Sequence, residues 1–237
     1  MKLALIGGGF VKHADNFHIN KRLAELTEKD APTVLFIPTA SNDEEDYINE
    51  FIEVFGNLLH CRVSVLRCVS ETPEEMDIME MVDAADLIYL GGGNYLNMME
   101  KWRERKLDEI LIDALEAGTF IAGISAGAIC WFKSGIRSDY EGEGYIESPG
   151  WSVINQVFCP HYNQSDRANE FHQMLFKKEV ESALALEDDC ALYVSDEGIE
   201  LIGEPSKAWS IQVRDGEIIK LNLDSTGRVL ELPSSIK

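Results

Sequence analysis

The sequence predicts a three-layer α/β/α fold built on a mostly parallel β-sheet with helices on both faces. Short, almost continuously apolar segments alternate with longer segments of helical periodicity, which is the pattern of a parallel sheet buried on both sides. Two of the apolar segments end in glycine runs, at residues 7–9 and 91–93. Beyond residue 190 the pattern changes to short strands separated by turns, which indicates C-terminal β-hairpins.

The first half of the chain supplies the alternation of strands and helices. Strands are expected at residues 3–6, 33–37, 62–66, 85–90 and 119–122, where apolar or β-branched residues predominate. Helices are expected at residues 16–26, 72–81, 96–102 and 107–116. A further amphipathic helix is expected to be capped by Ser41, Asn42 and Asp43 and to run to Phe55.

The second half is less regular. Residues 133–150 are rich in Gly, Ser and Glu and predict a long irregular loop. A strand follows at 155–160, and Ser165 and Asp166 are expected to cap a helix that runs to Lys178. Turns at 196–198, 214–216 and 225–227 separate short strands, which we expect to extend one edge of the sheet. With no repeat or linker, residues 1–237 are interpreted as one domain.

Composition and charge restrict the partners of this protein. Acidic residues outnumber basic ones 42 to 21, for a formal charge of −21. A field of this sign repels phosphate backbones and anionic membrane surfaces, so we expect neither nucleic acid nor a membrane as a partner. The apolar run at residues 3–6 is too short for a signal peptide or a membrane span. The cysteines are odd in number and form no Cys-x-x-Cys pair, which predicts free thiols and a cytoplasmic location.

The segment from Ile121 to Ala128 carries the strongest chemical signal. It reads as a buried strand that turns sharply into a helix, with Gly123 and Gly127 on either side of Ser125. This Gly-x-Ser-x-Gly pattern is typical of a nucleophile elbow, in which small neighbours allow a tight turn that exposes the serine hydroxyl. The alternative is an ordinary glycine-rich turn between a strand and a helix.

A serine nucleophile needs a base and an acid that orients the base. Of the five histidines, His161 alone follows a predicted buried strand directly, at the sheet edge where Ser125 emerges, so it is the expected base. For the acid, the segment between Ser125 and His161 offers Asp139, Glu141, Glu143 and Glu147. We favour Asp139, with Glu141 as the main alternative.

Two backbone amides are candidates for an oxyanion hole. The amide of Ala126 begins the helix after the serine, and Gly93 ends the glycine run after the fourth strand. A phosphate-binding role for these glycines is disfavoured, because neither run continues as a Gly-x-Gly-x-x-Gly or P-loop motif.

Three blocks together resemble the peptidase E family of serine peptidases, which includes aspartyl dipeptidase and, more distantly, cyanophycinase. They are Gly91–Asn94, Gly123–Ala128 and Pro160–Tyr162. The resemblance implies a flavodoxin-like sheet similar to class I glutamine amidotransferases, and a triad of Ser125, Asp139 and His161. It also places Gly93 and Ala126 in the oxyanion hole. The implied activity is removal of an N-terminal aspartate from small peptides, mainly dipeptides, without a metal or organic cofactor.

Recognition of aspartate requires a cation for its side-chain carboxylate. Arg167, at the start of the helix after His161, is the first candidate and Arg137 the second, and Asn94 is expected to contribute to substrate binding. A homodimer is compatible with the sequence, which does not fix the oligomeric state.

The sequence leaves two other functions open and disfavours a third. The first is a cyanophycinase-like isopeptidase or another acyl hydrolase. The second is a non-catalytic ligand-binding protein on the same fold. The third, an α/β-hydrolase esterase, is disfavoured because the loop-rich segment between Ser125 and His161 leaves little room for that fold's additional strand-helix units.

Overall fold

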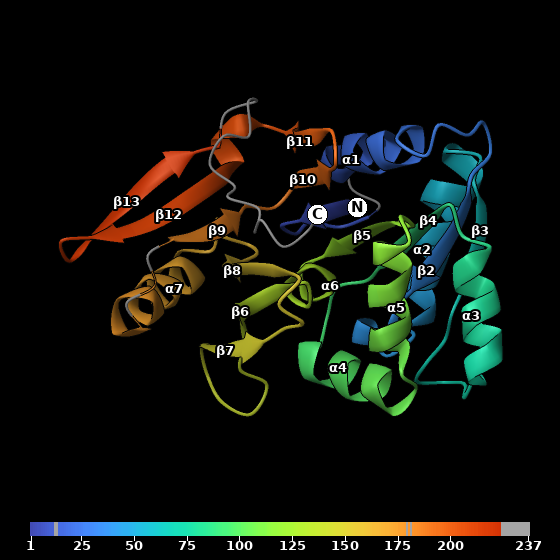
Figure 1. Ribbon diagram of the computed structural model, residues 1–237, viewed down its shortest axis with the longest axis horizontal. Coiled ribbons are helices and arrows are strands. Elements are labelled where there is room, and N and C mark those ends of the chain that lie inside the picture. The colour runs from blue at the N-terminus through green and yellow to red at the C-terminus, as the bar shows by residue number, and fades with distance from the viewer. Residues whose placement is uncertain (12–13, 179, 181, 224–237) are drawn as a thin grey trace.

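Two β-sheets lie next to each other in the structure, and helices pack against both (Figure 1). The computed structural model describes residues 1–11, 14–178, 180 and 182–223. The first sheet has seven strands in the order β11-β10-β1-β5-β4-β2-β3. These strands are β1 (Lys2–Ile6), β2 (Thr33–Ile37), β3 (Arg62–Val65), β4 (Leu87–Leu90), β5 (Phe120–Ile124), β10 (Cys190–Ser195) and β11 (Gly198–Gly203).

Strands β1 to β5 pair with one another in parallel, whereas β10 is antiparallel to β1 and to β11. Alternate residues of β1 enter different cores: Leu3 and Leu5 pack on one side, Ala4 and Ile6 on the other. Both faces are therefore covered. One face packs against α1 (Ala14–Glu25), α2 (Glu45–Phe51) and a π-helix, η2 (Ile52–Leu58); the other packs against α3 (Glu75–Asp83), α4 (Tyr95–Glu104) and α5 (Leu107–Glu116). The predicted three-layer α/β/α fold is confirmed.

The second sheet has six strands in the order β13-β12-β9-β8-β6-β7. They are β6 (Phe132–Ser138), β7 (Tyr145–Pro149), β8 (Ile154–Cys159), β9 (Ser182–Leu186), β12 (Ala208–Arg214) and β13 (Glu217–Asn222). Helix α7 (Ser165–Lys178) buries Phe171 and Leu175 against this sheet. The short helix α6 (Ala126–Ile129) lies where the two sheets meet (Figure 1). Two 3₁₀ turns, η1 (Thr39–Ser41) and η3 (Pro205–Lys207), complete the described elements.

The second sheet corrects two predictions. Residues 133–150 are not an irregular loop but largely the hairpin of β6 and β7, whose polar residues pair with one another. Ser134 Oγ donates a hydrogen bond to Glu147 at 2.6 Å, and Arg137 Nε donates to Ser148 at 2.7 Å, so polar side chains are accommodated inside these strands. The C-terminal strands were expected to extend one sheet edge, and only β10 and β11 do so. The predicted turn at 225–227 lies outside the described residues.

The expected cap of the second helix is also wrong. Asn42 and Asp43 both have positive φ, and α2 begins only at Glu45. The buried Asp43 carboxylate accepts hydrogen bonds from the backbone amides of Val69 and Ser70 at 2.6 and 2.9 Å. Its side chain therefore anchors the segment after β3 instead of capping a helix.

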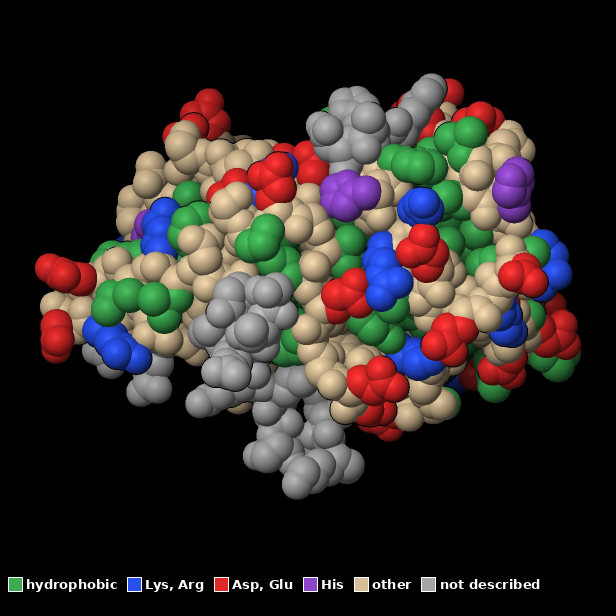
Figure 2. Space-filling view, turned by 90° about the horizontal axis from the view of Figure 1, so that it is seen from above, with side chains coloured by type: hydrophobic (Ala, Val, Ile, Leu, Met, Phe, Trp, Pro, Cys, Tyr) green, Lys and Arg blue, Asp and Glu red, His purple; other side chains and the backbone are tan. Residues whose placement is uncertain are grey.

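The five cysteines are all buried and free, as predicted. No helix within the described ranges has the length and apolarity needed to cross a membrane. Acidic side chains are scattered over the face seen in Figure 2, with basic ones interspersed, so the net negative charge is not gathered into one patch on that face.

Candidate active site

Ser125 occupies the sharp turn between β5 and α6. Its backbone has φ 52° and ψ −107°, a conformation that is strained for a residue with a side chain. The flanking glycines allow the turn, because a Cβ on Gly123 would lie 2.0 Å from the Gly127 carbonyl oxygen, and one on Gly127 would lie 2.4 Å from that of Leu90. The turn therefore has the sharp geometry expected of a nucleophile elbow, because only glycine fits at the two flanking positions.

His161 lies beside Ser125, as the sequence predicted. It follows β8, and its Nε2 atom is 2.8 Å from Ser125 Oγ. Its backbone amide donates a hydrogen bond to the Gly7 carbonyl oxygen at 3.1 Å, which ties the second sheet to the end of β1. Because Ser125 also donates its amide to Ile6 at 3.0 Å, both residues are positioned by the same strand end.

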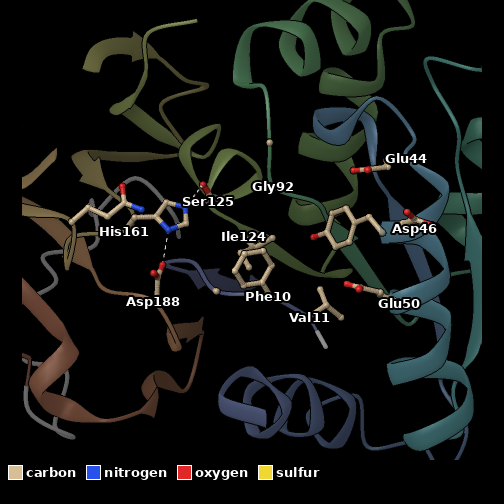
Figure 3. A pocket seen from close by; sticks show the side chains of 14 residues that line it. Phe10, Val11, Glu44, Asp46, Glu50, Gly92, Ile124, Ser125, His161 and Asp188 are labelled. Carbon is tan, nitrogen blue, oxygen red and sulfur yellow. Dashed lines mark hydrogen bonds and ion pairs between the residues drawn. The ribbon is translucent and has the colours of Figure 1, made fainter. Parts of the chain in front are cut away.

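Asp188 completes a chain of hydrogen bonds (Figure 3). Its Oδ1 atom is 2.5 Å from His161 Nδ1, and its Oδ2 atom accepts a hydrogen bond from Asn163 at 3.0 Å. Burial raises the pKa of this carboxyl. The hydrogen bonds from His161 and Asn163, with the positive charge of Arg167, outweigh that effect and hold the pKa below its ordinary value. Asp188 is therefore a carboxylate at neutral pH, suited to orient an imidazole.

The prediction that Asp139 would meet His161 is wrong. Asp139 lies in the turn of the β6–β7 hairpin, where its amide donates to the Gly144 carbonyl oxygen and its carboxylate accepts from the amide of Glu141. The alternative, Glu141, lies in the same turn. Both residues therefore belong to the hairpin turn, and the carboxylate beside the imidazole of His161 is that of Asp188.

Strand pairing explains why Asp188 was missed. Strands β8 and β9 are parallel neighbours, so their carboxyl ends reach the same edge. His161 stands two residues beyond the end of β8, and Asp188 stands two residues beyond the end of β9. The sequence does carry a signal, an apolar strand followed by Glu187, Asp188 and Asp189, but these acids lie after His161 and not between Ser125 and His161.

Gly8 is held directly against this hydrogen-bond chain. A Cβ there would lie 2.0 Å from Asp188 Oδ1 and 2.2 Å from His161 Nδ1. We expect Gly8→Ala to push these side chains apart and to lower kcat/KM by about 10²-fold, the usual cost of a displacement near 1 Å. The control is Gly56→Ala, where the nearest atom to the new Cβ is 3.6 Å away. Peptide hydrolysis assays and thermal melts of both variants would check this, and wild-type activity in Gly8→Ala would contradict the geometry.

Two buried arginines line a cavity next to the serine. This cavity has a volume of about 360 Å³ and is also bordered by Ser125, Ala126 and His161. Arg137 is 8% exposed and Arg167 is 6% exposed. Both predicted substrate-binding arginines therefore reach one site, although they come from different elements, β6 and α7.

The hydrogen-bond partners of the two guanidinium groups are neutral. Arg167 donates to Gln164 at 3.2 Å and to Ser138 Oγ at 3.3 Å, and its guanidinium lies 4.6 Å from the centre of the Tyr145 ring. Arg137 donates to Ser148 and to the Ser138 carbonyl oxygen, each at 2.7 Å. No carboxylate of the described residues forms a salt bridge with either arginine. A buried guanidinium that is not paired directly with a carboxylate favours binding of an anion.

The predicted oxyanion-hole residues border the same cavity. Gly93 has φ 136°, and a Cβ there would lie 2.3 Å from the Ala40 carbonyl oxygen, so only glycine fits. Ala126 is the first residue of α6. Asn94 also lines the cavity, but its side-chain oxygen accepts a hydrogen bond from the Asn97 amide and caps α4. The structure thus gives Asn94 a helix-capping role in addition to its place at the site.

A second cavity of about 510 Å³ opens on the other side of Ser125 and His161. Phe10, Val11 and Ile124 give it an apolar floor, and acidic residues of α2 and its start form the opposite wall (Figure 3). These are Glu44, Asp46 and Glu50. Across the described residues, no three His, Cys, Asp or Glu side chains gather in a way that could hold a metal ion.

Comparison with known proteins identifies the family of this chain and several of its relatives. The model of peptidase family S51 matches residues 3–202. The uncharacterized peptidase YgaJ of Bacillus subtilis is 34% identical over 225 residues, which cover 93% of this chain and 96% of that protein. A cyanophycinase of Geminocystis herdmanii is 22% identical over 78% of this chain and 70% of its own length.

Solved structures support the fold. A peptidase from an acI-B1 actinobacterium superposes with a TM-score of 0.71 at 20% identity, over 93% of each chain. A putative peptidase E protein from Listeria monocytogenes gives a TM-score of 0.60 at 19% identity, over 94% of this chain and 98% of that one. The match across most of the sequence, together with the fold, shows that this chain belongs to peptidase family S51.

Proposed function

We propose that the protein is a serine peptidase that hydrolyses small peptides, with dipeptides bearing an N-terminal aspartate as its preferred substrates. The observation that carries this proposal is the hydrogen-bond chain from Ser125 Oγ through His161 to Asp188, at 2.8 and 2.5 Å, on a strained elbow. Membership of a peptidase family supports the reaction type.

In the proposed mechanism Ser125 Oγ attacks the peptide carbonyl carbon while His161 Nε2 accepts its proton. Asp188 holds the imidazole through Nδ1 and stabilises the imidazolium that forms. The amides of Gly93 and Ala126 stabilise the tetrahedral oxyanion. His161 then protonates the leaving amine, the carbon–nitrogen bond breaks, and an acyl-enzyme on Ser125 remains. Water activated by His161 hydrolyses this ester and releases the free acid.

The arginine cavity supports the choice of an acidic residue at the acyl side of the bond. Arg137 and Arg167 lie beside Ser125, are almost completely buried and lack a carboxylate partner among the described residues. The side-chain carboxylate of an N-terminal aspartate would pair directly with these guanidinium groups. The apolar floor of the second cavity suits a leaving residue such as leucine.

The arginines provide a direct test of this specificity. We expect Arg167→Gln to lower kcat/KM for Asp-Leu by about 30-fold or more, because it leaves the substrate carboxylate unpaired in a buried site. Arg137→Gln is expected to act in the same direction. The matched control is Arg214→Gln, since Arg214 is exposed on β12 and distant in the fold from the cavity. An unchanged preference for Asp-Leu over Asn-Leu in both cavity variants would refute the assignment.

The test of the function itself is hydrolysis of a panel of X-Leu dipeptides, with Ser125→Ala in parallel. The proposal expects Asp-Leu to be cleaved fastest and the variant to be inactive. The similarity to a cyanophycinase makes isopeptide-linked peptides the second substrate class to assay. Cleavage of these alone would retain the serine mechanism and replace the dipeptide specificity.

A further inference from the structure

Tyr140 links the two halves of the candidate site. It lies in the turn of the β6–β7 hairpin and borders the arginine cavity together with Ser125. Its hydroxyl donates a hydrogen bond to the Gly93 carbonyl oxygen at 2.9 Å and accepts one from the Tyr95 amide at 3.3 Å. A tyrosine hydroxyl can donate and accept at once, so a single group joins the hairpin of the second sheet to the loop after β4.

The loop that Tyr140 contacts needs an external restraint. Gly93 has a backbone conformation that only glycine adopts readily, and glycine is also the residue with the widest choice of other conformations. The Asn94 amide donates to the Ala40 carbonyl oxygen at 2.6 Å, which fixes the far side of the loop. On the side of the loop that faces the hairpin, Tyr140 holds the Gly93 carbonyl and the Tyr95 amide, which lies in the first turn of α4 and has no partner within that helix.

The same tyrosine is in contact with the arginine cavity. The guanidinium carbon of Arg137 lies 5.5 Å from the centre of the Tyr140 ring, within range of a cation–π interaction. Arg137 and Tyr140 are carried by one hairpin, at the end of β6 and in the turn that follows. A side chain that borders the arginine cavity is thus hydrogen-bonded to the loop with the proposed oxyanion donor.

From these contacts we propose that Tyr140 is a positioning residue. Its hydroxyl holds the Gly93 loop in the orientation that the oxyanion hole requires, and its place on the hairpin couples that orientation to the arginine cavity. This inference rests on the proposed function of Gly93 but not on the preferred peptide. Tyr140 itself takes no part in proton transfer.

The variant that isolates the hydroxyl is Tyr140→Phe, which keeps the ring beside Arg137. Two measurements are independent of peptide specificity: hydrogen–deuterium exchange of residues 91–97, and the rate at which a fluorophosphonate labels Ser125. We expect faster exchange confined to that loop and labelling slowed by about 10-fold or more, a fraction of the 10²–10³ that a lost oxyanion donor costs. For a cleaved dipeptide, kcat should fall while KM stays within about 2-fold.

The matched control is Tyr193→Phe, which removes a hydroxyl from a buried tyrosine on β10 that does not line either cavity at Ser125. It should label and exchange like the wild type, and thermal melts of both variants would show whether stability has changed. Wild-type labelling and exchange in Tyr140→Phe would overturn the inference.

The outcomes separate this inference from the proposed function. If the wild type labels but cleaves no dipeptide, the substrate assignment fails and the two measurements still decide the role of Tyr140. If the fluorophosphonate does not label the wild type, the serine mechanism fails, and hydrogen–deuterium exchange alone tests the role of Tyr140. Equal exchange of residues 91–97 in wild type and Tyr140→Phe would then refute the restraint on the loop.

Discussion

Replacing Ser125 with alanine is expected to lower turnover by about 10³-fold or more, because the other members of a triad contribute little once the nucleophile is gone. The hydroxyl is 2.8 Å from His161 Nε2, so the same change also removes the partner of the base. His161→Ala should cause a loss of similar size, and the double variant should be no worse than either single one, since the residues act as a unit.

The measurement is steady-state hydrolysis of the best dipeptide of the panel, with fluorophosphonate labelling followed by mass spectrometry. Ser195→Ala, which changes a half-buried serine at the end of β10, is the matched control. Near-normal turnover in Ser125→Ala would refute the serine mechanism, whatever the substrate.

Replacing Asp188 with asparagine is expected to lower kcat by about 10³- to 10⁴-fold, because an amide can stabilise the wrong tautomer of His161 and cannot stabilise the imidazolium. Asp139→Asn is the matched comparison and should retain wild-type turnover, since its side chain accepts a hydrogen bond only within its own hairpin turn. If Asp139→Asn were the inactive variant and Asp188→Asn the active one, the assignment of the acid would be reversed.

The protonation of Asp188 makes its contribution to folding stability depend on pH. A carboxyl group whose pKa is lowered on folding stabilises the folded protein at any pH above its unfolded-state pKa. This stabilisation is lost as the pH falls through its folded-state pKa. Since the pKa of Asp188 lies below the ordinary value of 3.8, the carboxylate is fully ionised near neutrality. The contribution of Asp188 to the free energy of unfolding should therefore be constant between about pH 6 and pH 8 and should be lost as the pH falls below about 4, which unfolding of wild type and Asp188→Asn across this range would check.

Local patterns predicted much of this site. The sharp turn at Ser125 depends on contacts between residues close in sequence, such as Gly123 against Gly127, so the motif alone indicated it. His161 was found because a histidine directly after a buried strand lies at the edge where parallel strands end. The alternation of buried strands and amphipathic helices predicted the three layers, since period and length are properties of short segments.

The remaining features depend on which strands become neighbours. Asp188 reaches His161 because β9 pairs with β8. Arg137 and Arg167 share one cavity because α7 packs against the second sheet, to which the β6–β7 hairpin belongs. Tyr140 contacts the Gly93 loop across the junction of the two sheets. Such contacts join segments far apart in the chain, and their free energy comes from packing that no single segment contains. The sequence by itself therefore determined most of the elements and the candidate nucleophile and base, whereas only the tertiary structure decided the candidate acid, the cavity shared by the two arginines and the contact of Tyr140 with the glycine loop.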